Sequence, residues 1–136
     1  MLSDTKALLD EPPLSQQTLA ASEAFMDGRF GEALETSESL IDKMPREAWS
    51  WRFKGECLLF LQRYEDAAEC FQKAMELGAY GTEDTFLWQA MALQNAGEPE
   101  KAKAVLESFL AQDGGLPDLT HKAQSSLGDL RRDVSS

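Results

Sequence analysis

A short segment recurs three times along this chain, at intervals of about 34 residues. The three copies read Phe30-Gly31-Glu32-Ala33, Tyr64-Glu65-Asp66-Ala67 and Pro99-Glu100-Lys101-Ala102. Other apolar positions keep the same register, namely Leu40, Ala74 and Phe109. A fixed period of this length is typical of a solenoid in which helix-turn-helix units stack on one another. The recurrence therefore predicts a fold built from repeated helix pairs.

Apolar residues follow helical spacing from about residue 14 almost to the end of the chain. In the second copy, Tyr64, Ala67, Ala68 and Phe71 fall on one helix face. We predict helices near residues 14–27, 30–43, 47–61, 64–77, 83–95, 98–111 and 117–132. Pro99 stands at a predicted helix start, where proline is tolerated. No segment alternates apolar and polar residues with period two, so we expect no strands.

The breaks between the predicted helices also repeat. Gly28 and Gly97 stand at the turn within a pair, where a positive φ is easiest for glycine. The last predicted helix has one apolar stripe, formed by Leu116, Leu119, Ala123, Leu127 and Leu130. A helix of this kind at the end of an array covers the core of the last repeat. We expect residues 117–132 to act as a solvating cap.

The second repeat resembles a known family pattern. It reads Trp51-x-x-Lys54-Gly55-x-x-Leu58, then Ala67-x-x-x-Phe71, then Ala74. This is similar to the tetratricopeptide repeat, although Lys54, Leu58 and Ala79 replace a leucine, a tyrosine and a proline of that pattern. The resemblance implies an all-α solenoid of three helix pairs and a capping helix, about seven helices in a right-handed superhelix. Gly55 and Ala67 are small where the two helices of a pair would cross closely.

The same resemblance sets the expected domain organisation. Residues 1–13, which end in Pro12-Pro13, form an N-terminal arm, and residues 14–132 form one repeat domain. The repeats occupy about residues 14–47, 48–82 and 83–116, and residues 133–136 form a disordered tail.

The charge of the chain limits the partners it can have. The formal net charge is −11. Binding to nucleic acid phosphates or to anionic membranes requires basic surface, so we expect neither as a partner. The first 17 residues lack a basic start followed by an apolar run, and we expect a cytoplasmic protein. The acidity itself is explained by solubility or by a basic partner.

No group of residues in the sequence is arranged for catalysis. His121 is the only histidine and falls on the polar side of the last predicted helix. Cys57 and Cys70 fall on predicted helices and are interpreted as small buried residues. No phosphate-binding loop, metal-ligand spacing or nucleophile motif is present. We therefore expect no enzymatic activity, no cofactor and no metal.

In the tetratricopeptide family the first helix of each pair lines a concave groove. By that resemblance, the expected partner-binding residues share an apolar, aromatic-rich surface with two charged members. They are Phe25, Trp49, Arg52, Phe53, Glu56, Phe60, Leu87, Trp88 and Met91. The alternative, which the sequence leaves open, is that Phe53, Phe60 and Trp88 are buried between adjacent helices.

Two functions fit this pattern. The first is an adaptor or chaperone-like protein that holds a peptide or helix of a partner protein in the groove. The second is a self-assembly module that forms a homo-oligomer through the groove or the N-terminal arm. Adaptors of this family that grip acidic C-terminal tails use lysine, asparagine and arginine on the inner faces. Here Arg52 is the single basic groove residue, so we expect that a C-terminal carboxylate is not the main determinant.

Overall fold

The computed structural model describes residues 13–78 and 85–111, together with Gln124, Ser125 and Gly128. These residues contain six helices and no strand. The helices are α2 (Leu14–Met26), α3 (Phe30–Lys43), α4 (Ala48–Phe60), α5 (Tyr64–Glu76), α6 (Thr85–Asn95) and α7 (Pro99–Ala111). Their bounds lie within two residues of the predicted ones. Pro99 is the first residue of α7, as predicted. Of the expected capping helix, only Gln124, Ser125 and Gly128 are described, and all three are helical; its apolar stripe lies outside the described residues.

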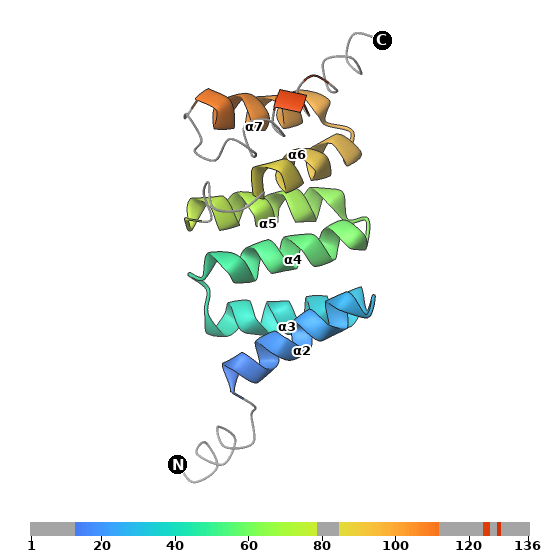
Figure 1. Ribbon diagram of the computed structural model, residues 1–136, viewed down its shortest axis with the longest axis vertical. Helices are drawn as coiled ribbons and strands as arrows, with labels where there is room; N and C mark the ends of the chain where they lie inside the picture. Colours follow the sequence, from blue (N-terminus) through green and yellow to red (C-terminus); the bar gives the residue numbers. More distant parts are fainter. Residues whose placement is uncertain (1–12, 79–84, 112–123, 126–127, 129–136) are drawn as a thin grey trace.

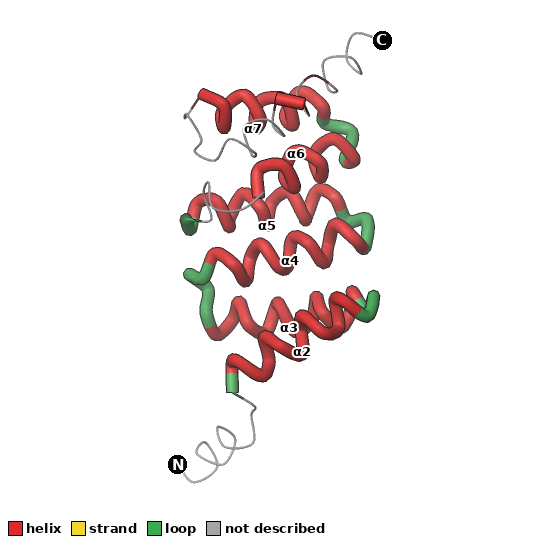
Figure 2. Tube along the Cα trace, in the orientation of Figure 1, coloured by secondary structure: helices red, strands yellow, loops and turns green. Residues whose placement is uncertain are grey.

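The helices form three consecutive pairs that stack along the long axis of the molecule (Figure 1). Each helix packs chiefly against the next one in the chain, and α4 also touches α6. The described connections within and between pairs are short turns (Figure 2). The chain is therefore an all-α solenoid of helix pairs.

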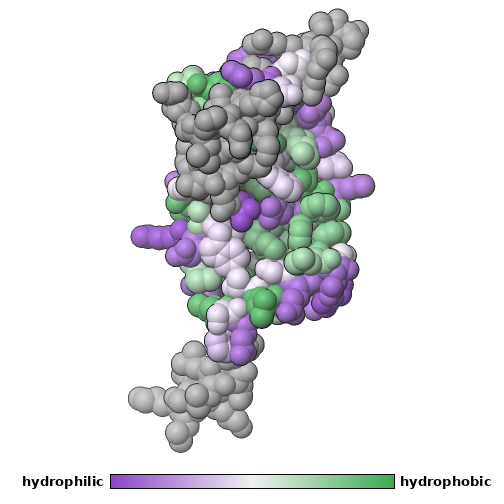
Figure 3. All heavy atoms as spheres, viewed as in Figure 1, coloured by the Kyte–Doolittle hydropathy of each residue, from purple (hydrophilic) through white to green (hydrophobic). Residues whose placement is uncertain are grey.

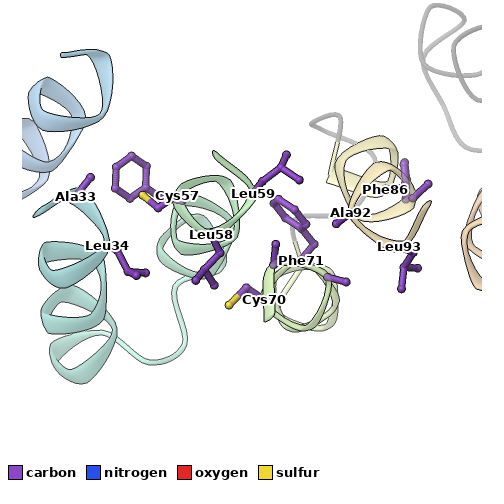
Figure 4. Packing of buried hydrophobic residues seen from close by; sticks show 14 of the residues in the cluster. Ala33, Leu34, Cys57, Leu58, Leu59, Cys70, Phe71, Phe86, Ala92 and Leu93 are labelled. Atoms are coloured by element: carbon purple, nitrogen blue, oxygen red, sulfur yellow. The ribbon is translucent and has the colours of Figure 1, made fainter. Parts of the chain in front are cut away.

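Two of the repeated sequence positions are among the most deeply buried in the described residues. Ala33, Ala67 and Ala102 are each 0% exposed, and Leu40, Ala74 and Phe109 are exposed by 1% or less. Close packing leaves room only for the small alanine side chain at the first set, whereas the second set holds side chains of different size, from Ala74 to Phe109. Figure 4 shows the core running from Ala33 and Leu34, past Leu58, Cys70 and Phe71, to Ala92 and Leu93.

The turn within each pair has the same geometry in all three repeats. The backbone N–H of Arg29 donates to the oxygen of Ala24 at 2.8 Å, and that of Gly28 donates to Phe25 at 3.0 Å. These two hydrogen bonds form a Schellman motif, which needs a residue in the left-handed conformation directly after the helix C-cap. The residues in that position are Gly28, Gln62 and Gly97, with φ of 81°, 64° and 81°. The predicted positive φ at Gly28 and Gly97 is confirmed, and Gln62 adopts the same conformation without being a glycine.

Gly55 leaves no room for a side chain where the two helices of the second pair meet. A Cβ added there would lie 2.7 Å from the Phe71 ring, nearer than real contacts allow. Phe71 itself is 0% exposed, so its ring has no free space to move into. At the matching positions the first pair has Ala21 with Ser37, and the third has Ala90 with Leu106. The larger Phe71 is therefore accommodated by the absence of a side chain at residue 55.

Replacing Gln62 with glycine is expected to stabilise the protein by about 0.5–1 kcal/mol, because it removes a left-handed conformation that side chains disfavour. Gly97→Ala is the matched control and should destabilise by about 1 kcal/mol, since no atom crowds that position. Urea unfolding followed by circular dichroism measures both. Equal stability of all three proteins would contradict the assignment of strain to φ.

Gly55→Ala is expected to cost about 1–3 kcal/mol by overpacking against Phe71. Phe71→Leu should cost about 1–2 kcal/mol through the volume it leaves empty. The double variant reproduces the pairing of Ala90 with Leu106 and should be about 1 kcal/mol more stable than the sum of the single effects predicts. Strict additivity in a double-mutant cycle would show that the two residues do not share one space.

Candidate functional site

The nine expected groove residues all lie on the first helices of the pairs, α2, α4 and α6. Phe60 and Met91 are about half exposed, at 50% and 48%. Phe25, Trp49, Leu87 and Trp88 are partly buried against the core, whereas Phe53 is only 8% exposed. Of the three residues that could instead have been buried between helices, Phe53 is buried and Trp88 is partly buried. Phe60 is accessible to a ligand, and so is Met91.

Four phenylalanine rings meet where the first and second pairs join. Phe25 lies 5.3 Å from both Phe30 and Phe60 and 5.7 Å from Phe53, measured between ring centroids. Phe30 and Phe60 are stacked at 5.0 Å. Such ring pairs contribute roughly 0.5–1.5 kcal/mol each beyond the area they bury. We call Phe25, Phe30, Phe53 and Phe60 the aromatic cluster; it fixes the first pair against the second.

Phe30 was not among the expected site residues. It is the first residue of α3 and directly follows the turn at Gly28, so it lies beside the end of α2. Helical spacing along α2 or α4 could not reveal it, because it belongs to neither helix. The repeated turn could have revealed it, since that turn returns the chain to the end of α2.

Two of the expected groove residues are tryptophans that pack against the core. Trp49 lies 6.3 Å from the Phe53 ring, and Trp88 lies 6.4 Å from Phe71, the central residue of the preceding pair. Both indole rings are partly buried. They therefore contribute to the core and remain partly accessible.

Arg52 and Glu56, the expected charged residues, form an ion pair with each other. The Arg52 Nη1 donates to Glu56 Oε1 at 3.2 Å, one helical turn apart on α4. Their side chains are 27% and 15% exposed. Breaking a partly buried pair leaves one charge poorly compensated, so Arg52 is not readily available to an anionic ligand.

Exposed hydrophobic side chains are unevenly distributed among the described helices. The large ones are Leu14, Leu19, Met26, Phe60, Leu61 and Met91. All come from α2, α4 or α6, or from the C-cap of α4, and none comes from α3, α5 or α7. Figure 3 shows hydrophobic surface gathered on the side of the molecule where α4 and α6 end. The first helices therefore supply apolar accessible surface, which we call the inner face. It comprises Leu14, Leu19, Met26, Phe60 and Met91, and the C-cap residue Leu61 is not part of it.

The two cysteines are buried free thiols, as interpreted from the sequence. Burial, with a smaller effect of the Glu56 charge, raises the pKa of Cys57 to about 12. Burial also raises the pKa of Cys70 to about 11, although the Lys54 charge acts in the opposite direction. Both thiols are thus held in the neutral, unreactive form near neutral pH.

The described residues contain neither a metal site nor a membrane-spanning helix. They contain no group of three or more histidine, cysteine or acidic side chains placed to hold a metal ion. None of their helices combines the length and the hydrophobicity needed to cross a bilayer.

Two segments of the chain, residues 50–77 and 84–114, match models of the tetratricopeptide repeat. No curated protein sequence matches the chain. Among solved structures, the fold is similar to SycD, a type III secretion translocator chaperone of Yersinia enterocolitica. The TM-score is 0.79 and the identity 20%, over 97% of this chain and 94% of that one.

Two other solved structures have the same fold. A type III secretion complex from Aeromonas hydrophila gives a TM-score of 0.80 at 18% identity, over 90% of this chain and 83% of that one. The second tetratricopeptide domain of human RPAP3, in complex with an HSP70 peptide, gives 0.72 at 20% identity, over 85% and 92%.

The buried cysteines give a direct test of the packing around α4 and α5. Near pH 8, a thiol with a pKa of about 11 carries about 100-fold less thiolate than one at the ordinary value of 9.0. We expect the native protein to react with Ellman's reagent at least about 100-fold more slowly than the urea-unfolded chain, which exposes the same thiols. A fast reaction of either cysteine in the native protein would contradict this burial.

Proposed function

Because this chain is a tetratricopeptide repeat protein, we propose that its inner face binds an apolar peptide or helix of a partner protein. It acts without catalysis, as an adaptor or chaperone-like module. The observation that carries the proposal is that the exposed large hydrophobic side chains of the described helices come from α2, α4 and α6.

Exposure on this scale favours a ligand. Leu19, Met26, Phe60 and Met91 are 59%, 84%, 50% and 48% exposed, respectively. Covering apolar surface contributes about 25 cal/mol per Å², and contiguous exposed patches are typical of binding surfaces. Methionine side chains adapt to differently shaped partners, which suits a surface for segments of varied sequence.

The charge of the inner face favours an apolar segment over a terminal carboxylate. Arg52 is the single basic residue among the expected groove residues, and it forms the ion pair with Glu56. An acidic C-terminal tail would meet both this pair and a chain of net charge −11. We infer that ligand side chains, rather than a C-terminal group, supply most of the affinity.

The similar solved structures are consistent with a peptide ligand. One is a translocator chaperone, and another holds an HSP70 peptide. Since Arg52 is paired and the accessible surface is apolar, the proposal resembles capture of an apolar segment, as by a chaperone, more than recognition of a charged tail.

Self-assembly is the second candidate, and one observation favours it. Leu14, Leu19 and Met26 are all exposed on α2, the first described helix, which has no described helix pair before it. A second copy could cover this end of the stack. Light scattering after size exclusion decides between the two, because self-assembly requires a dimer or larger species that Leu19→Ser disperses.

The partner-binding proposal is tested with one matched set of variants. Met91→Ser and Leu19→Ser remove exposed apolar groups from the inner face, and Leu61→Ser removes one from the α4 C-cap. Partners are captured from source cells with the wild-type chain, identified by mass spectrometry, and titrated by calorimetry. We expect both inner-face variants to weaken binding about tenfold or more, with Leu61→Ser unchanged. A partner that binds all four proteins equally would contradict the proposal.

A further inference from the structure

A groove runs along the side of the molecule opposite the inner face, between α5 and α7. Both helices pack on α6, whose side chains form the floor of the groove. Two hollows of about 310 and 300 Å³ make up this space, and Gln72 and Gln89 line both of them. We call the combined space the outer groove.

Gln89 has an unsatisfied polar atom in the floor of the outer groove. Its side chain is only 5% exposed, and its Nε2 donates to Gln72 Oε1 at 2.9 Å. Its Oε1 is buried and has no hydrogen-bond partner. A buried acceptor without a donor costs about 1–3 kcal/mol, so a ligand that donates a hydrogen bond here recovers that energy.

The surroundings of Gln89 indicate that the donor should be a cation. Glu65 and Glu69 of α5 and Glu98, next to α7, line the second hollow. Lys101 lines it as well, but its ammonium donates to Glu98 at 2.8 Å. The acidic residues outnumber this one lysine, so the groove attracts a further positive charge.

The first hollow suits the stem of a long basic side chain. Met75 of α5, Phe86 of α6 and Val105 of α7 give it apolar walls. Lysine and arginine bury their methylene stems against such surfaces and keep the charged end near polar groups. The outer groove therefore offers an apolar section beside an acidic one, with Gln89 lining both.

The preceding seam of the solenoid contains a cation of its own at the equivalent position. Gly55 and Ala90 correspond in the repeat, so Lys54 occupies in the second pair the position that Gln89 occupies in the third. Glu38 likewise corresponds to Gln72. The charges of Lys54 on α4 and Glu38 on α3 both act on Cys70 of α5, which places a lysine and an acidic residue around this thiol. At the α5–α7 seam, the same position holds a neutral side chain.

We propose that the outer groove binds a lysine or arginine side chain of a basic segment in a partner protein. The cation lies between Glu69 and Glu98 and donates to Gln89 Oε1, as Lys54 supplies a positive charge at the seam before it. This site does not include the inner face, so the proposal does not depend on the proposed function.

The test uses a fluorescein-labelled octalysine peptide as the probe and octaglutamine as its neutral control, measured by fluorescence anisotropy at physiological ionic strength. Gln89→Lys fills the outer groove with a cation from the chain itself. Glu69→Gln removes one acidic group of the groove. Glu35→Gln is the matched control, because residue 35 is the exposed α3 counterpart of Glu69 and its replacement changes the net charge equally.

We expect octalysine, but not octaglutamine, to bind the wild-type chain. Gln89→Lys should weaken octalysine binding about tenfold, and Glu69→Gln should weaken it several-fold more than Glu35→Gln does. Met91→Ser should bind the probe as the wild type does, which separates this site from the inner face. Circular dichroism checks folding, and if Gln89→Lys does not fold, the comparison of Glu69→Gln with Glu35→Gln decides.

Two results would overturn the proposal. Equal weakening by Glu69→Gln and Glu35→Gln would show that octalysine responds only to the overall charge of the protein. A dimer in light scattering that Gln89→Lys abolishes would show that a second copy of this chain, and not a basic partner, occupies the outer groove.

Discussion

The close approach of the two helices within each pair determines the rest of the structure. Ala33, Ala67 and Ala102 are fully buried at this crossing, and Gly55 faces the Phe71 ring with no room for a Cβ. Because the crossing is tight, the large side chains of the second helices reach past it to the neighbouring pair, as Phe71 reaches Trp88. Contacts of this kind between neighbouring pairs hold the pairs in a stack. The stack in turn places all first helices on one side.

The helix order and the core could be predicted from the sequence because both depend on local patterns that repeat. Three copies of each position show which apolar residues belong to packing, and Gly28 and Gly97 mark the turns. The positive φ of Gln62 was not predicted, because glutamine, unlike glycine, does not favour the left-handed conformation. There the bonds of the Schellman motif impose the conformation on the residue.

The candidate site was less predictable, since it depends on contacts between different helices. Helical spacing placed Phe53 and Phe60 on one face, but the structure buries Phe53 against Phe25 and leaves Phe60 half exposed. Both rings contact Phe25 of the first pair, but Phe53 lies in the middle of α4 and also contacts Trp49, whereas Phe60 is the last residue of that helix. The unsatisfied oxygen of Gln89 is likewise invisible in the sequence, because it depends on how α5 and α7 enclose α6.

The aromatic cluster has a consequence for how the chain acquires its structure during synthesis. Contacts run between successive helices, so the first pair can form before the rest of the chain has been made. That pair alone would leave the rings of Phe25 and Phe30 without the partners that α4 supplies. The earliest stable intermediate should therefore contain α2, α3 and α4 rather than one helix pair. A nascent chain that stops before Phe60 would expose aromatic surface that is prone to aggregation. The rate at which the ribosome elongates the chain across α4 sets how long that exposure lasts.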